Sequence, residues 1–218
     1  MLGVSLSTKF PAIGAISSFA RAGVGAIATQ ARTNPLLAIN GLDLLEEGYG
    51  AEEALRELLD SDHEPERRQL AVVDARGNSA AHTGAATDPW CGHRTGPGYA
   101  VAGNLLVGEE TVTAMAGTFE ASDGQPLSER LVQALEAGQA AGGDKRGKQS
   151  AALYVVSTEP YPYLDLRVDE HPEPVAELRR VYEIAKVEML PLIEALPTQQ
   201  RPKVDLGEEI RGTLIPEG

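Results

Sequence analysis

Hydrophobic and polar residues alternate in short runs over the first thirty residues of the chain. These runs are rich in β-branched and small residues and are separated by turn-forming residues around Pro11 and Gly23. Alternation with a period of two is typical of half-buried strands. The pattern predicts three strands, at Leu2–Thr8, Gly14–Phe19 and Val24–Gln30.

The spacing of apolar residues then changes to that of a helix. Asn34 and Pro35 form a typical helix start, with asparagine as the N-cap and proline at the first helical position. Leucines follow at helical spacing up to Gly48, which suits the end of a helix. Helical spacing recurs in four later segments, at Ala51–Asp60, Val112–Phe119, Leu127–Leu135 and Pro174–Leu190.

Further alternating runs between these helices predict more strands. Two of the runs flank a glycine-containing turn at Gly77 and are typical of a hairpin. The runs lie at Gln69–Ala75, Ser79–Thr83, Gly98–Leu106, Gln149–Ser157 and Tyr163–Val168.

Strands and helices therefore occur in groups, with strands in runs of up to three and helices mostly in pairs. A doubly wound parallel sheet needs single strands that alternate with helices, so the grouping argues against it. We expect an α+β fold in which two mostly antiparallel sheets carry helices on their outer faces. Residues 1–190 are predicted to form a single domain and residues 191–218 an irregular C-terminal tail.

Charge and composition narrow the classes of partner. The chain has 32 acidic and 19 basic residues, a formal net charge of −13. Nucleic acids and anionic membranes both attract clustered basic residues, so we expect neither as a partner. The sequence shows no secretory signal and no apolar run of the ~20 residues that a membrane span needs. We therefore expect a cytoplasmic protein whose partner is a small-molecule substrate or ligand.

Residues that bind metals or form disulfides are few. Cys91 is the single cysteine, so an intramolecular disulfide is excluded. The four histidines lack the spacing of metal ligands and have no cysteine partner. We expect no metal and no other cofactor.

Two glycine-rich stretches carry most of the candidate chemistry, Gly92–Asn104 and Gly142–Ser150. Glycine lets the backbone approach a ligand closely, and loops with several polar groups often form binding sites. The glycine spacing of the second stretch is not that of a phosphate-binding Walker loop. Together the stretches predict a shaped polar site on an α/β scaffold.

Several motifs occur in order over roughly the first four-fifths of the chain. They are Leu2–Gly14, Gly23–Ala31 with Asn34-Pro35, Arg68-Gln69-Leu70, His82-Thr83-Gly84, the two glycine-rich stretches and Asp165–Asp169. In these motifs the chain resembles a prokaryotic family known as domain of unknown function 1028, which is grouped with the N-terminal nucleophile (Ntn) hydrolase-like superfamily. The resemblance implies a four-layer α/β/β/α sandwich and association into homo-oligomers, but no settled reaction.

In Ntn hydrolases a Thr, Ser or Cys at the start of the mature chain attacks an amide carbonyl, and its own α-amino group is the base. Relatives of this chain usually carry an additional strand that opens with Thr or Ser. Met1 and Leu2 begin this sequence, so the domain is expected to lack its first strand. Either the true start lies upstream or this copy lacks the nucleophile. The first explanation is favoured because the loss of a strand would expose a hydrogen-bonding ladder.

The resemblance suggests three catalytic residues near the nucleophile position. Ser7 and Lys9 lie at the end of the first predicted strand, where a lysine would lower the pKa of the amine. A solvent-facing lysine at a strand end is the alternative. Asn104 follows Gly103 at a strand end and is predicted to stabilise an oxyanion, and a turn-forming Gly-Asn pair is the alternative.

A further set of residues is predicted to bind or orient the substrate. Arg146 suits bidentate contact with an anion, while a solvated charged turn is the alternative for Asp144 and Arg146. The predicted set is Gln30, Asn34, His93, Arg94, Gly103, Asp144 and Arg146.

The leading hypothesis is an Ntn-type amidohydrolase that acts on a small amide-containing substrate, or a degenerate member of that class. A non-catalytic small-molecule-binding or assembly protein on the same scaffold is the alternative, supported by the missing nucleophile. A third hypothesis is a thiol enzyme that uses Cys91 with His93, although a buried inert thiol explains Cys91 more simply.

Alternating charges at Asp165, Arg167 and Asp169 are typical of a sheet edge or a subunit contact.

Overall fold

The computed structural model describes residues 1–203 of the chain. The larger sheet has four antiparallel strands in the order β2, β3, β4, β5. Their bounds are Ser18–Arg21, Gly25–Gln30, Gln69–Asp74 and Ser79–Thr83. β3 and β4 are central and mostly buried, in agreement with their runs of small and β-branched residues.

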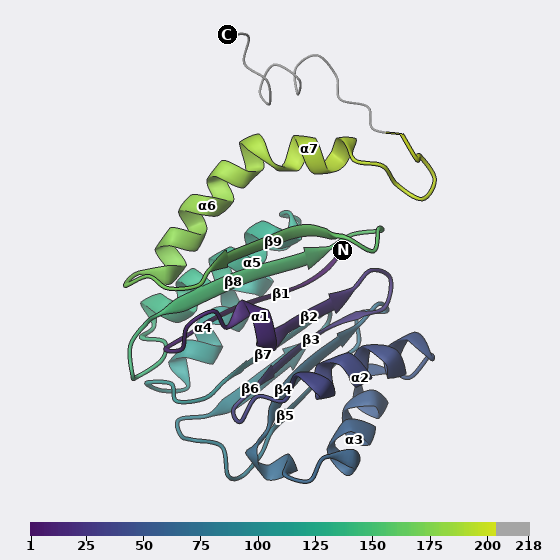
Figure 1. Ribbon diagram of the computed structural model, residues 1–218. Helices are drawn as coiled ribbons and strands as arrows, with labels where there is room; N and C mark the ends of the chain where they lie inside the picture. Colours follow the sequence, from purple (N-terminus) through teal and green to yellow (C-terminus); the bar gives the residue numbers. More distant parts are fainter. Residues whose placement is uncertain (204–218) are drawn as a thin grey trace.

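Helices α2 (Pro35–Glu46) and α3 (Ala51–Ser61) cover one face of this sheet (Figure 1). Asn34 caps α2 as predicted, because its side chain accepts a hydrogen bond from the Leu36 N–H at 3.2 Å. The apolar faces of both helices pack on buried residues of β3 and β4, which include Ile27 and Leu70. This burial of apolar surface holds the helix pair on the sheet.

The second sheet has three antiparallel strands in the order β1, β8, β9. Their bounds are Leu2–Thr8, Ser150–Val156 and Pro162–Val168. Helices α5 (Leu127–Ala140) and α6 (Pro174–Glu188) pack on one face of this sheet around Leu153, Leu164 and Leu178. Within residues 1–203, β1 pairs only with β8 and is therefore an edge strand.

A separate hairpin completes the fold, formed by β6 (Gly92–Gly96) and β7 (Tyr99–Gly103). Helix α4 (Glu110–Ala121) packs on it through a core that contains Tyr99, Val101, Val112 and Phe119. Helix α4 also packs against α5, so the hairpin is joined to the three-stranded sheet through two helices.

The two larger sheets lie next to each other in the middle of the molecule. Strand β1 contacts β2 and β3 of the four-stranded sheet, and β8 contacts β2. The helix pairs α2–α3 and α5–α6 lie on the sides that point away from this contact (Figure 1). Strands that are far apart in the sequence, β1 to β3 and β8, therefore lie side by side where the two sheets meet.

Two predictions about strands were wrong. The expected strand Gly14–Phe19 starts as a short helix, α1 (Gly14–Ser17), and becomes extended only from Ser18. The backbone N–H groups of Ile16 and Ser17 bond back to the Ile13 carbonyl at 3.1 and 3.2 Å, which closes a helical turn. Because alternation is weak in a segment of small residues, the pattern did not separate the turn from the strand.

The segment Gly92–Gly96, expected to be part of a glycine-rich loop, is strand β6, so residues 1–203 form three sheets rather than two. Its three central residues are all exposed, so β6 has no buried face and shows no apolar alternation. The expected irregular tail begins instead with helix α7 (Leu190–Ala195), whose Ala195 is buried. The part of the tail at residues 204–218 lies outside the described residues.

In the part of the chain from residue 1 to residue 203, every helix is either too short or too polar to cross a lipid bilayer.

Candidate functional site

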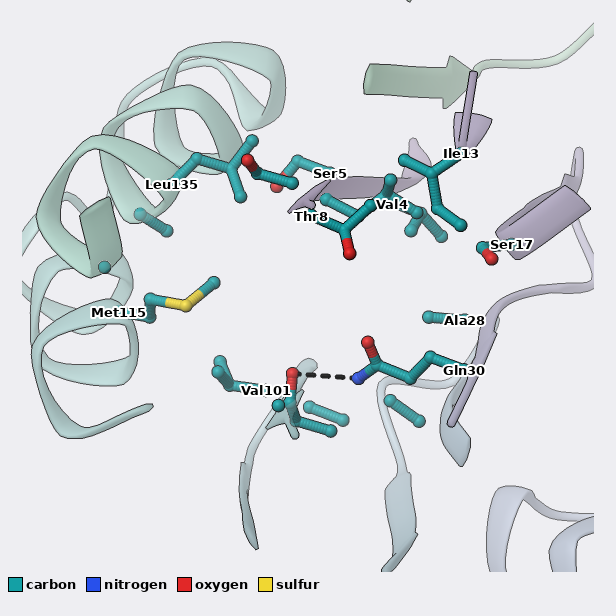
Figure 2. Close-up of a pocket in the computed structure, with 18 of the residues that line it drawn as sticks. Val4, Ser5, Thr8, Ile13, Ser17, Ala28, Gln30, Val101, Met115 and Leu135 are labelled. Atoms are coloured by element: carbon teal, nitrogen blue, oxygen red, sulfur yellow. Dashed lines mark hydrogen bonds between the residues drawn. The ribbon is translucent and has the colours of Figure 1, made fainter. Parts of the chain in front are cut away.

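A cavity of about 560 Å³ lies beside strand β1, between the two larger sheets and the α4–α5 pair. All of β1 and β7, most of β3, and residues of α1, α4 and α5 line it. Figure 2 shows Met115 and Leu135 on one side of this cavity, and Ile13 and Ser17 on the other. Thr8 and Gln30 face each other across it (Figure 2).

The two glycine-rich stretches meet at this cavity. The Lys145 N–H donates to the Leu105 carbonyl at 2.8 Å, and the Val107 N–H donates to the Gly143 carbonyl at 3.0 Å. Leu106 and Asp144 form a β-bridge between these bonds. The structure thus brings the end of the first stretch to the start of the second, although some forty residues separate them in sequence.

A polar cluster forms where β1 ends against this junction. The Asp144 carboxylate accepts hydrogen bonds from the Lys9 N–H at 3.2 Å and from the Arg146 N–H at 2.9 Å. The Arg146 guanidinium donates to both carboxylate oxygens of Asp144, at 3.0 and 2.6 Å, and more weakly to the Thr8 hydroxyl at 3.4 Å. The bidentate contact expected for Arg146 is therefore made with a carboxylate of its own loop.

These contacts decide the ionisation of Asp144. Burial acts to raise the pKa of this carboxyl, but the hydrogen bonds from Arg146 and from the Lys9 N–H outweigh it and lower the pKa. The pKa of Arg146 is raised in turn by its hydrogen bond to Asp144. The pair is ionised at neutral pH and its charges cancel at the mouth of the cavity.

Replacing Asp144 with alanine is expected to lower the free energy of unfolding by roughly 1–3 kcal/mol at neutral pH, because the Lys9 N–H and Arg146 lose a largely buried acceptor. A carboxyl with a lowered pKa stabilises the fold above its ordinary pKa of about 4, and this stabilisation is lost as the pH falls through the lowered value. The difference between wild type and variant should therefore shrink on acidification, as measured by urea unfolding.

Asp43→Ala is the matched control, because Asp43 also pairs with an arginine, Arg21, at 2.8 Å but is 55% exposed. Its loss should amount to no more than about 1 kcal/mol. Equal losses for the two variants would contradict the assigned role of Asp144.

A second polar network centres on Gln69, a fully buried residue of β4. Its amide nitrogen lies 2.9 Å from the Gly103 carbonyl, 3.2 Å from the Gly92 carbonyl and 2.9 Å from the Thr83 hydroxyl. Its amide oxygen accepts a hydrogen bond from the Asn104 side chain at 3.1 Å. The network ties β4, β5 and the β6–β7 hairpin together directly behind Asn104.

Backbone geometry also marks this end of the cavity. Ala31 and Leu105, the residues that follow Gln30 and Asn104, have φ angles of 52° and 54°. Left-handed backbone costs a non-glycine residue roughly 1–2 kcal/mol, and such residues are concentrated at functional sites. Both residues line the cavity.

The predicted site residues divide into two groups. Six of them line the cavity: Ser7, Gln30, Gly103, Asn104, Asp144 and Arg146. Lys9 joins the group through its backbone contact with Asp144, while its ammonium group lies 3.5 Å from the Lys148 carbonyl.

The remaining predicted residues lie elsewhere. Asn34 caps α2. His93 bonds to the Thr83 hydroxyl at 2.9 Å and lines a separate surface groove beside α3, and Arg94 is exposed, 3.4 Å from the Thr113 hydroxyl. The Cys91 thiol donates to the Thr87 carbonyl at 3.5 Å, and within residues 1–203 it forms no hydrogen bond with His93.

The polar residues of the cavity or its support that sequence reasoning missed include Thr8, Ser17, Gln69 and Thr111. Gln69 was visible as a polar residue opening an apolar run and as part of a quoted motif. Nothing in the sequence distinguishes the hydroxyl residues from ordinary strand and helix residues. Within residues 1–203, no group of three or more His, Cys, Asp or Glu side chains is arranged to hold a metal ion.

Comparisons with known proteins agree with this architecture. Residues 1–178 match the model of a family of unknown function, DUF1028. The crystal structure of protein SPO2555 from Silicibacter pomeroyi, described with the same family model, is similar with a TM-score of 0.85 and 28% sequence identity. The match covers 94% of this chain and 93% of that one. No curated protein matches the sequence.

Proposed function

The chain belongs to the DUF1028 family, and we propose that it binds a small uncharged molecule in the cavity beside β1. One observation carries the proposal. Ser17 and Thr111 line the cavity, and their hydroxyl groups are buried and have no hydrogen-bond partner within residues 1–203. Buried polar groups in native proteins almost always have hydrogen-bond partners. We therefore expect a bound molecule or ordered water to supply the missing partners of these two hydroxyls.

The size and charge of the cavity support a small neutral ligand. Its volume of about 560 Å³ is typical of small-molecule sites, and much of its wall consists of apolar side chains such as Val4, Val101 and Met115. Asp144 and Arg146 neutralise each other at the mouth, and the other two charged lining residues, Arg32 and Asp88, have opposite signs. An anionic ligand would have to displace this pair, whereas a neutral one leaves it intact.

Thr111→Val is expected to raise the free energy of unfolding of the unliganded protein by roughly 1 kcal/mol, because valine has the same shape and removes an unpartnered buried hydroxyl. Thr29→Val is the matched control. Thr29 is equally buried, but its hydroxyl donates to the Asn34 carbonyl at 3.2 Å, so its loss should destabilise the protein by about 1 kcal/mol. Urea unfolding measures both values, and a destabilised Thr111→Val protein would contradict the proposal.

Binding itself is tested with a panel of small neutral amides and their carboxylate analogues. We expect the neutral compounds to raise the Tm of the wild-type protein, because only binding to the folded state stabilises it. Thr111→Val and Ser17→Ala should reduce that shift. If no neutral compound raises the Tm, or if the carboxylates raise it more, the assigned ligand class is wrong.

A second candidate function is amide hydrolysis of the Ntn type. The order of helix pair, sheet, sheet and helix pair supports a four-layer α/β/β/α arrangement (Figure 1). Strands of both inner sheets, β1 and β3, line the cavity. This function requires an N-terminal Thr or Ser as the nucleophile. Lys9, beside the end of β1, would lower the pKa of its α-amino group, and Asn104 would bind the developing oxyanion.

Mass spectrometry separates the two candidates. Hydrolysis predicts release of product from an amide substrate and a covalent adduct with a hydroxyl- or amine-reactive electrophile. Thermal stabilisation by neutral amides without turnover or adduct would leave binding as the function.

A further inference from the structure

We propose that Gln69 is a positioning residue that makes the cavity select ligands carrying N–H or O–H donors. The inference rests on the proposed function and adds to it the hydrogen-bonding character of the ligand. Gln69 itself is fully buried and is not among the residues that line the cavity. It acts through Asn104, which does line it.

The orientation of the Gln69 amide follows from its partners. Two of them are the backbone carbonyls of Gly92 and Gly103, which can only accept hydrogen bonds. The amide nitrogen must therefore face them, and the amide oxygen must face Asn104. A flipped Gln69 would place its oxygen against two carbonyl oxygens in a buried site, which is strongly unfavourable.

The orientation of Asn104 follows in turn. Because the oxygen of Gln69 faces it at 3.1 Å, Asn104 must present its amide nitrogen to that oxygen. Its own oxygen Oδ1 then points away from Gln69, and no group within residues 1–203 donates to Oδ1. Gln69 thereby orients Asn104 so that its unpaired amide atom is an acceptor and not a donor.

Gln30 also presents its amide oxygen to the cavity, but a different contact fixes its orientation. Its amide nitrogen donates to the Ala102 carbonyl at 3.0 Å, and Figure 2 shows its oxygen directed into the cavity. Gln30, at the end of β3, and Asn104, directly after β7, both line the cavity, and we take their two amide oxygens as the acceptors for one bound molecule. A ligand with an NH₂ group, such as a primary amide or a urea, matches them, whereas a ligand with acceptors only leaves them unpaired.

The first test needs no ligand. In the wild-type protein one side-chain amide proton of Asn104 should exchange slowly with solvent in NMR experiments and show a trans-hydrogen-bond coupling to Gln69. The amide protons of Asn40, an exposed asparagine of α2, provide the unprotected reference. If those of Asn104 exchange as rapidly as those of Asn40, the inference is overturned.

The second test compares benzamide with acetophenone, which replaces the NH₂ group by CH₃ and keeps the shape. We expect the wild-type protein to bind benzamide about 3- to 10-fold more tightly, the effect of a neutral hydrogen bond. Gln69→Met and Asn104→Ala should each reduce that preference by about threefold or more. Thr83→Val is the control, because it removes another partner of Gln69 and leaves the contact with Asn104 in place.

The outcomes separate this inference from the proposed function. If neither compound binds the wild-type protein, the proposed ligand class fails, and the exchange experiment still decides the role of Gln69. If benzamide binds and Asn104→Ala loses the preference while a folded Gln69→Met keeps it, Gln69 does not position Asn104. An equal loss in Thr83→Val would show that general loosening of the hairpin, and not the Gln69–Asn104 contact, sets the preference.

Discussion

Replacing Asp74 with alanine is expected to lower the free energy of unfolding by about 3 kcal/mol at neutral pH. The Asp74 side chain is only 3% exposed and accepts hydrogen bonds at the turn between β4 and β5. Its donors include the backbone N–H groups of Arg76 and Asn78, at 2.9 and 3.0 Å, and the Asn78 side chain at 2.8 Å. A weaker contact at 3.4 Å reaches the Ala51 N–H at the start of α3, where the helix dipole favours a negative charge. The substitution would leave these donors without their buried acceptor.

The pH dependence of this effect has a defined sign. Burial tends to raise the pKa of Asp74, but the hydrogen bonds from Asn78, Arg76 and Ala51 outweigh it and lower the pKa. The stabilisation is therefore complete above about pH 4 and lost as the pH falls through the lowered value. Urea unfolding at several pH values measures it. Asp123→Ala, at a carboxylate that is 88% exposed, is the control and should change stability by less than about 1 kcal/mol.

Leu153→Ala is expected to destabilise the protein by about 3–4 kcal/mol. Leu153 is fully buried on β8, the central strand of the three-stranded sheet, and belongs to the core formed with α5 and α6. Truncation removes buried apolar surface and leaves a void that the central strand cannot easily fill. Because β1 pairs only with β8 within residues 1–203, the cavity wall depends on the same strand.

The control for this prediction is Leu36→Ala, at a leucine on α2 that is 61% exposed. Its effect should stay within about 0.5 kcal/mol, because the side chain buries little surface and alanine is a good helix former. Denaturant unfolding of both variants gives the comparison. Similar losses at the two positions would mean that the core does not centre on Leu153.

Most elements were predictable because their signals are local. The strand Leu2–Thr8 was predicted with the bounds that the structure shows, and the helix start at Asn34-Pro35 was recognised from its cap. Apolar spacing and capping depend on residues within a few positions of one another. The same reasoning failed for Gly92–Gly96, because an exposed hairpin strand buries no face and leaves no apolar pattern.

Candidate site residues were predictable only as residue types. Asp144, Arg146 and Asn104 were identified from glycine-rich loops, and all three line the cavity. What each of them contacts was not predictable. The sequence suggested that Arg146 binds an anionic ligand, whereas in the fold its guanidinium is held by Asp144.

The sequence by itself determined the periodicity of most strands and helices, the α+β class and the two polar glycine-rich stretches, because each of these depends on near neighbours in the chain. Only the tertiary structure decided which polar groups are satisfied and which are left free. The Lys9 N–H finds its acceptor 135 residues away at Asp144, and Asn104 finds Gln69 35 residues away. The hydroxyls of Ser17 and Thr111 find none within residues 1–203. Whether a buried polar group has a partner depends on distances between distant segments, and those distances exist only after the sheets have packed together.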